Sequence, residues 1–255
     1  MKIKTVKPLI FLFTVMTLAS LACSVDLYGT PTPTSVPSAV KMSTPSEQTA
    51  VAIQPTATAQ QFYTEKFDTE DNNWEYLIVN GSNKQIANSS TGLMPMRTAG
   101  GLLVFDLKNK GTLAYATYKP FTYTDVRFDI KVGNRGNNNN NINLICRKSD
   151  AGWYEFDIAS NGLYQIFFAK TVGDTIEYTQ MADGGSSKIK TGWAENEYGI
   201  VCQGNTLVLN INGAEVRRLE DKKHLLPEGK VGISVSSLKD APITVDLYSA
   251  SISRP

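Results

Sequence analysis

The sequence is poor in histidine and cysteine, which many catalytic triads and zinc sites require. Its 255 residues include a single histidine, His224, and three cysteines. The sequence therefore has too few histidines and cysteines for a histidine-based catalytic triad or a Cys/His zinc site to be expected. Lysine and arginine number 25 against 24 acidic residues, and no large basic block occurs. Because binding to nucleic-acid phosphates needs clustered positive charge, we expect no nucleic-acid partner.

The apolar run near the N-terminus, Leu9 to Ala22, is several residues too short for a membrane-spanning helix. Such a helix needs roughly 20 apolar residues. Three lysines precede the run, and it ends in Ser20-Leu21-Ala22-Cys23. This order is typical of a secretory signal, and it favours export over permanent spanning by an uncleaved helix.

The residues just before Cys23 resemble the lipobox of bacterial lipoproteins, in which the cysteine thiol is diacylated before cleavage. The usual box has a branched aliphatic residue three positions before the cysteine, where this sequence has Ser20. The resemblance implies that residues 1–22 are a signal peptide and that a lipid on Cys23 anchors the protein to a membrane outside the cytoplasm, at the bacterial cell surface or envelope. The alternative is ordinary cleavage that leaves Cys23 free.

Between the anchor and residue 61 the chain is rich in Thr, Pro and Ser, with almost no aromatic residues and little charge. Such a composition cannot bury enough apolar surface to fold. We therefore expect residues 23–61 to form a disordered tether. Whether the tether lifts the following domain off the membrane or has no role of its own stays open.

From residue 62 onward the composition changes to short runs of Val, Ile, Tyr, Phe and Thr, separated by Asn, Gly, Asp and Ser. No segment has a convincing helical period. The dipeptides Asn161-Gly162 and Asn212-Gly213 predict tight turns that join antiparallel strands. We predict one all-β domain over residues 62–255, a two-sheet antiparallel sandwich. The predicted strands are 62–67, 74–79, 102–107, 113–118, 126–132, 142–147, 153–159, 164–169, 198–202, 207–211, 215–217, 231–235 and 243–248.

Cys146 and Cys202 remain as an even pair if Cys23 carries a lipid. Each cysteine lies in an alternating apolar segment, on the same parity as Leu144 and Ile200 respectively. Both thiols should therefore point into one core, and an oxidising compartment makes a disulfide between them plausible. Two separately buried thiols are the alternative.

Several segments together resemble LamG-like domains of the concanavalin A-like superfamily, and also the branch known as 3-keto-disaccharide hydrolases. The resemblance covers about residues 62–253 and implies a jelly-roll sandwich with one concave face, on which relatives often bind glycans and some cleave them. Its motifs are mostly structural, so they specify the fold better than an activity. They are Leu144-Ile145-Cys146-Arg147, Gly152-Trp153-Tyr154-Glu155-Phe156, Cys202-Gln203-Gly204-Asn205, Asn210-Ile211-Asn212-Gly213 and Gly229-Lys230-Val231-Gly232-Ile233.

Strand alternation places a group of polar residues on one face of the sandwich. Over residues 153–158 the aromatic and aliphatic side chains at alternate positions point inward. This leaves Trp153, Glu155 and Asp157 together on the opposite face. If residues 148–152 close a hairpin, Arg147 of the preceding strand lies opposite Trp153 and Asn143 lies near Asp157, so both join this face. An indole among carboxylate, guanidinium and amide groups suits a sugar, although a solvated outer face with one exposed Trp is equally compatible. The candidate ligand-binding residues are Asn143, Arg147, Trp153, Glu155 and Asp157.

The paired acids also raise the question of glycoside hydrolysis. Glu155 and Asp157 should lie about 7 Å apart by strand geometry, within the range that glycosidases use. Concanavalin-like glycosidases carry a third acid on this strand, in a Glu-x-Asp-x-x-Glu or similar pattern, where this sequence has Ala159 and Ser160. We therefore expect a non-catalytic carbohydrate-binding module. A structural or protein-interaction domain of the envelope and a glycoside or 3-keto-disaccharide hydrolase are the alternatives.

The asparagine-rich segment 134–141 offers carbonyl oxygens to a calcium ion but no carboxylate. Calcium sites normally include formal charge, so a polar loop between strands is favoured, with a calcium site as the alternative, and no other metal or cofactor is expected. The three functional hypotheses differ in what they require of the fold. A binding module requires an exposed Trp153 in a concave face, an enzyme requires a deep pocket with a perturbed Glu155 or Asp157, and an interaction domain requires a flat apolar patch.

Overall fold

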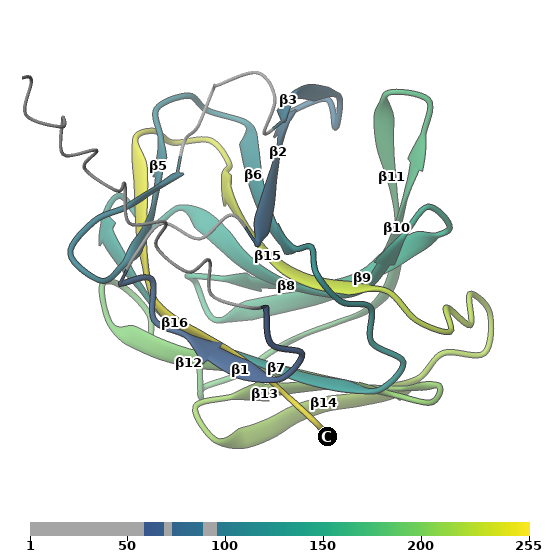
Figure 1. Ribbon diagram of the computed structural model, residues 1–255. Helices are drawn as coiled ribbons and strands as arrows, with labels where there is room; N and C mark the ends of the chain where they lie inside the picture. The colour runs from purple at the N-terminus through teal and green to yellow at the C-terminus, as the bar shows by residue number, and fades with distance from the viewer. Residues whose placement is uncertain (1–58, 69–72, 89–95) are drawn as a thin grey trace, which may run out of the picture. The chain divides into compact units, whose positions relative to one another are not determined.

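The computed structural model describes residues 59–68, 73–88 and 96–255, and within these residues the regular structure is entirely β (Figure 1). The predicted signal peptide, Cys23 and nearly all of the predicted tether lie outside the described residues. No helix among the described residues is long and apolar enough to cross a membrane. The strands are β1 (Tyr63–Glu65), β2 (Trp74–Asn80), β3 (Gln85–Asn88), β4 (Met96–Thr98), β5 (Leu103–Leu107), β6 (Thr112–Tyr118), β7 (Val126–Gly136), β8 (Asn140–Ser149), β9 (Gly152–Ala159), β10 (Leu163–Val172), β11 (Thr175–Gly185), β12 (Glu195–Gln203), β13 (Thr206–Ile211), β14 (Ala214–Glu220), β15 (Lys230–Ser237) and β16 (Ile243–Ser253).

The strands form two antiparallel sheets that pack face to face. Sheet A has the order β14-β13-β12-β7-β16-β5-β4, with β1 also paired to β16. Sheet B has the order β11-β10-β9-β8-β15-β6-β2-β3. Several neighbours within each sheet are distant in sequence, such as β7 with β16 and β8 with β15, as expected for a jelly roll. The predicted fold class, a two-sheet antiparallel jelly-roll sandwich, is confirmed.

The main core lies between the sheets and follows strand alternation. In β7 the alternating apolar residues from Val126 to Val132 are buried in this core, while Arg127 and Asp129 pair on the outer face of sheet A. In β9 the buried set is Tyr154, Phe156 and Ile158. Burial of each such side chain stabilises the fold by about 1.5–3 kcal/mol. The inward assignments made from sequence are confirmed for both strands.

A disulfide joins the two sheets. Cys146 in β8 of sheet B is bonded to Cys202 in β12 of sheet A, with the Cα atoms 6.7 Å apart and a sequence separation of 56 residues. Both residues belong to the main core. Closing a loop of this length stabilises the folded state by about 4 kcal/mol on the chain-entropy account. The predicted pairing of these cysteines is confirmed in the structure.

One of the two predicted tight turns is confirmed, whereas the other turn and the asparagine-rich segment differ from the sequence expectation. The Asn212-Gly213 turn has positive φ at both residues, 49° and 80°, as predicted. At Asn161-Gly162 only the glycine has positive φ, and its N–H donates to the Ala159 carbonyl, so the two residues are not a two-residue turn of that type. The asparagine-rich segment is also mostly strand rather than loop, because β7 continues to Gly136 and β8 begins at Asn140.

Sheet B is strongly curved, and its concave face points away from sheet A (Figure 1). Strands β2 and β3 bend up on one side of the floor formed by β15, β8 and β9, and β10 and β11 bend up on the other. The tips of these two hairpins are joined by backbone hydrogen bonds, Gln85 N–H to Asp174 O at 2.9 Å and Ile176 N–H to Asn83 O at 2.8 Å. Lys84 and Asp174 add an ion pair at 2.8 Å. We call this contact the strap.

Candidate functional site

The concave face under the strap is a second, smaller hydrophobic core. Trp153 is only 2 % exposed, and its ring meets that of Tyr115 edge-on with centroids 6.4 Å apart. The expectation of an exposed Trp153 is therefore wrong, because the curved sheet and the strap cover it. The solvated outer face that was the alternative is not found either. The buried members of this concave-face core are Val79, Tyr115, Ile145, Trp153, Ala169 and Ile176.

Glu155 lies in this core and is fully buried. The Trp153 indole N–H donates to its Oε2 at 2.8 Å, and the Asn143 amide donates to its Oε1 at 2.9 Å. The hydroxyls of Tyr115 and Ser234 approach the carboxylate at 3.3 Å. Burial raises the pKa of Glu155, and these donors oppose the rise by stabilising the charged form. Three of the five candidate residues, Asn143, Trp153 and Glu155, are therefore in direct contact.

Asp157 follows on the same face of β9. Burial raises its pKa well above the ordinary value, and the charge of nearby Glu155 raises it further. Its Oδ2 accepts a long hydrogen bond of 3.4 Å from the Asn141 amide, and its buried Oδ1 has no partner among the described residues. Two neighbouring carboxylates in a poorly solvated site cannot both ionise cheaply. The pair therefore retains a proton to higher pH than isolated carboxyl groups do.

Arg147 does not join this group. Residues Cys146 and Tyr154 pair across β8 and β9, but the next pair is Ser149 with Gly152, so a bulge interrupts the register at Arg147. Its backbone has a φ of 55°, and its guanidinium donates to the carbonyls of Leu226 at 2.6 Å and Thr124 at 2.9 Å. The predicted position of Arg147 opposite Trp153 is thus wrong, because the hairpin is not regular there.

Lys148 takes the place on the concave face that Arg147 was expected to fill. Its ammonium group donates to the Thr117 hydroxyl at 3.1 Å. Burial lowers the pKa of Lys148, and the negative charge of Glu75 partly opposes this. No carboxylate among the described residues forms an ion pair with Lys148, whereas neighbouring Lys230 pairs with Glu75 at 3.3 Å. Sequence reasoning missed Lys148, since only the bulge turns it to this face.

One end of the concave face opens into a cleft of about 490 Å³, which we call the concave-face cleft. Trp153 forms part of its wall, and two lysines and two acids provide charge of both signs. The partly buried Lys148 is the feature most in need of a partner, since an anionic group in the cleft would stabilise its charge. The lining residues are Glu75, Leu77, Gln85, Lys148, Ser149, Asp150, Trp153, Thr171 and Lys230.

The buried position of Glu155 does not favour catalysis by the paired acids. Glycoside hydrolysis needs two carboxyl groups that reach the substrate, and Glu155 is sealed beneath Tyr115 and Trp153. The third acid of the concanavalin-like glycosidase pattern is replaced by Ala159 and Ser160. The Ser160 hydroxyl instead donates to the Asn140 side chain at 2.9 Å. The raised pKa values of Glu155 and Asp157 are therefore explained by burial.

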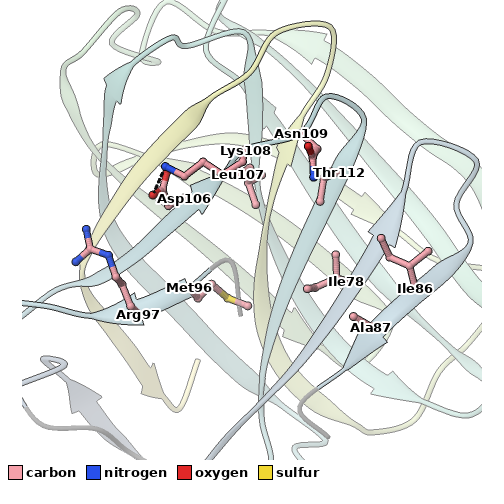
Figure 2. A pocket seen from close by; sticks show the side chains of 10 residues that line it. All are labelled: Ile78, Ile86, Ala87, Met96, Arg97, Asp106, Leu107, Lys108, Asn109 and Thr112. Carbon is pink, nitrogen blue, oxygen red and sulfur yellow. Dashed lines mark ion pairs between the residues drawn. The ribbon is translucent and has the colours of Figure 1, made fainter. Parts of the chain in front are cut away.

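A second pocket, of about 350 Å³, lies beside β3, β4 and β5 (Figure 2). Its wall includes Ile78, Ile86, Met96 and Leu107, and Figure 2 shows the ion pair between Lys108 and Asp106 at its rim, 2.6 Å long. No aromatic side chain of the described residues lines it. This lining lacks the aromatic and polar combination that favours a sugar.

No three His, Cys, Asp or Glu side chains gather into a metal-binding group in the part of the chain that the structure describes. In the asparagine-rich segment, Asn139 donates to Asp240 at 2.9 Å. A single carboxylate that already accepts a hydrogen bond from an amide does not provide the several oxygen ligands that calcium needs. We derive no metal-dependent step for this protein.

Comparison with known proteins identifies the fold. No protein-family model and no curated protein matches the sequence. The chain is similar in structure to LamAcat from Zobellia galactanivorans, with a TM-score of 0.53, 11% identity and coverage of 75% of this chain and 96% of that one. It is also similar to the GH16 protein of the Bacteroides ovatus mixed linkage glucan PUL in complex with a G4G4G3G product, with values of 0.55, 10%, 75% and 99%.

A third similar structure is the Bacillus licheniformis beta-glucanase, with a TM-score of 0.52, 9% identity and coverage of 77% of this chain and 99% of that chain. Identities this low establish the architecture and not the activity. The described chain therefore has the concanavalin A-like jelly-roll fold that GH16 glycoside hydrolases share.

Proposed function

We propose that this protein is a lipid-anchored, extracytoplasmic glycan-binding protein without catalytic activity, and that the concave-face cleft binds a sugar that carries a carboxylate. The observation that carries the proposal is the pairing of an indole wall, Trp153, with the partly buried ammonium of Lys148, which has no ion-pair partner among the described residues, in one cleft. The sugar ring would contact the indole edge while its carboxylate pairs with the ammonium group.

The proposed location rests on the N-terminal sequence. The lysines, the apolar run and Cys23 are typical of a lipoprotein signal, and the Thr- and Pro-rich segment after Cys23 is suited to a tether. The Cys146–Cys202 disulfide is compatible with an oxidising compartment. A domain held in this way would face ligands outside the cell membrane.

The fold adds support for a carbohydrate ligand. The similar structures include a protein in complex with a glucan product and a beta-glucanase, so this sandwich can present sugar-binding surfaces. The sealed Glu155 and the missing third acid argue against hydrolysis by this chain. Binding without cleavage is the function that agrees with both features.

The test is a glycan array probed with the full-length chain purified in detergent. It should contain uronate-bearing and neutral oligosaccharides, and it compares wild type with Lys148→Met and with the matched control Lys222→Met, which changes an exposed lysine. We expect Lys148→Met to weaken binding to uronate-bearing glycans by about tenfold or more, and the control to leave it unchanged.

Two outcomes would contradict the proposal. Equal binding of uronate-bearing glycans by wild type and Lys148→Met would show that the concave-face cleft is not the binding site. Release of reducing ends from laminarin or mixed-linkage glucan by the wild-type chain would contradict a non-catalytic role.

A further inference from the structure

Four loops at one end of the sandwich surround another pocket, of about 480 Å³. We call it the loop-end pocket, and it is lined by residues 138–141, 159–161, 191–192 and 238. These segments belong to the β7–β8, β9–β10, β11–β12 and β15–β16 connections and their adjoining strand ends. From this pocket and the tryptophan beside it we infer a second glycan-binding site, specific for neutral sugars and independent of the concave-face cleft.

The first argument is the chemistry of the lining. Five of its residues are asparagines, and the others are Ala159, Ser160, Thr191, Gly192 and Leu238, so none of the described side chains that line it carries a charge. Each carboxamide offers both donors and an acceptor, which matches the dual character of sugar hydroxyl groups. An ion would find no counter-charge in this pocket, whereas a neutral polyhydroxylated ligand would need none.

The second argument is an unsatisfied donor in the pocket wall. Asn140 is 2 % exposed, and its Oδ1 accepts a hydrogen bond of 2.9 Å from the Ser160 hydroxyl. Asn134 donates to that same hydroxyl at 3.0 Å, which fixes the orientation of the group. The Asn140 Nδ2 is buried and finds no acceptor among the described residues. A ligand hydroxyl in the pocket would supply that acceptor, and buried polar groups normally have one.

The third argument is the position of Trp193, which directly follows Gly192 of the pocket wall. Its side chain is 73 % exposed, the highest value among the large apolar residues that the structure describes. The indole N–H donates to the carbonyl of Gly136 at 2.6 Å, two residues before Asn138 of the pocket wall. The ring is thus held beside the loop-end pocket with most of its surface open to solvent.

A held, exposed indole beside amide groups matches the amphipathic shape of a sugar. The apolar face of a pyranose ring can stack on an aromatic ring, while its hydroxyl groups reach polar partners at the edge. Leu238, itself exposed, adds apolar surface to the pocket. The charged concave-face cleft and the uncharged loop-end pocket would therefore select different sugars.

The experiment titrates the full-length chain with a panel of neutral tetrasaccharides: laminaritetraose, cellotetraose, xylotetraose, mannotetraose and chitotetraose. The variants are Trp193→Ala, Asn138→Ala and the control Ile86→Ala, which shortens an exposed apolar side chain outside the pocket. We expect at least one tetrasaccharide to bind the wild type, with affinity reduced about tenfold or more by Trp193→Ala and less by Asn138→Ala. The control should bind like wild type.

Lys148→Met separates this site from the concave-face cleft. It should leave neutral binding unchanged, and Trp193→Ala should leave binding to uronate-bearing glycans unchanged. Absence of binding to every neutral tetrasaccharide at millimolar concentration would overturn the inference. Equal binding by wild type and Trp193→Ala, with the variant folded by circular dichroism, would overturn it as well.

Discussion

The concave face and the loop-end pocket each combine a tryptophan with amide and hydroxyl groups, yet the two regions differ in what covers them. Trp153 is 2 % exposed beneath the strap, whereas Trp193 is 73 % exposed beside an open pocket. In the concave face the polar groups bond to one another around Glu155. In the loop-end pocket a buried amide donor has no acceptor in the described part of the chain. Around Glu155 these residue types thus stabilise the packed core, whereas in the loop-end pocket an amide donor remains available to a ligand.

The largest expected effect is the difference in stability between the two tryptophan variants. Trp153→Ala should lower the free energy of unfolding by about 3–5 kcal/mol, because it leaves a cavity in the concave-face core. Trp193→Ala should change it by no more than about 0.5 kcal/mol, since the side chain is mostly exposed. Urea denaturation of both variants beside wild type measures this. Similar values for the two would contradict the buried concave face.

The next effect concerns the protons on the concave face. Folding raises the pKa of Asp157 and Glu155, so the folded state holds a proton that the unfolded chain releases above about pH 4. Stability contributed by this pair is therefore present at low pH and is lost as pH rises through the folded-state pKa.

Asp157→Asn should reduce that loss, because the amide cannot ionise. The folded wild type loses the stability of its bound proton as pH rises, so the stability of the variant should increase relative to wild type between pH 4 and pH 8. Urea midpoints at several pH values give the difference. Parallel pH profiles for the two proteins would show that Asp157 is not perturbed by the concave face.

The fold was largely predictable because its main core obeys simple alternation. The alternating segments around Phe128 and Phe156 face the core as predicted, and the shared parity of Cys146 and Cys202 anticipated their pairing. The strands that escaped prediction are β3, β4 and β11. β3 and β4 are short, and β11 at the edge of sheet B has only Ile176 and Ala182 buried, so its sequence shows no clear apolar period.

The candidate site was harder to predict for related reasons. Trp153 is covered by the strap, which β3 and β11 help to form, so missing those strands meant missing its burial. The bulge at Arg147 has positive φ without a glycine or asparagine to indicate it. Trp193 gave a weak signal that could have been read, an aromatic residue in a turn-rich segment next to Gly192.

The smallest effect should come from the ion pair of the strap. Lys84 and Asp174 have exposed side chains, and exposed pairs contribute little to stability. The backbone hydrogen bonds between the hairpins do not involve the lysine side chain. Lys84→Ala should therefore leave the urea midpoint and the tryptophan emission maximum unchanged. A red shift of the emission would show that the ion pair keeps the concave face closed.

The central claim of the comparison is that neutral glycans contact the loop-end pocket while the core of the concave face stays packed. The most direct test is to follow the indole N–H resonances of Trp74, Trp153 and Trp193 in an ¹⁵N-labelled chain during titration with the neutral tetrasaccharide that binds best. We expect the Trp193 resonance to shift and those of Trp74 and Trp153 to remain in place. A shift of Trp153 with Trp193 unchanged would mean that the concave face opens to neutral glycans, and it would contradict the account.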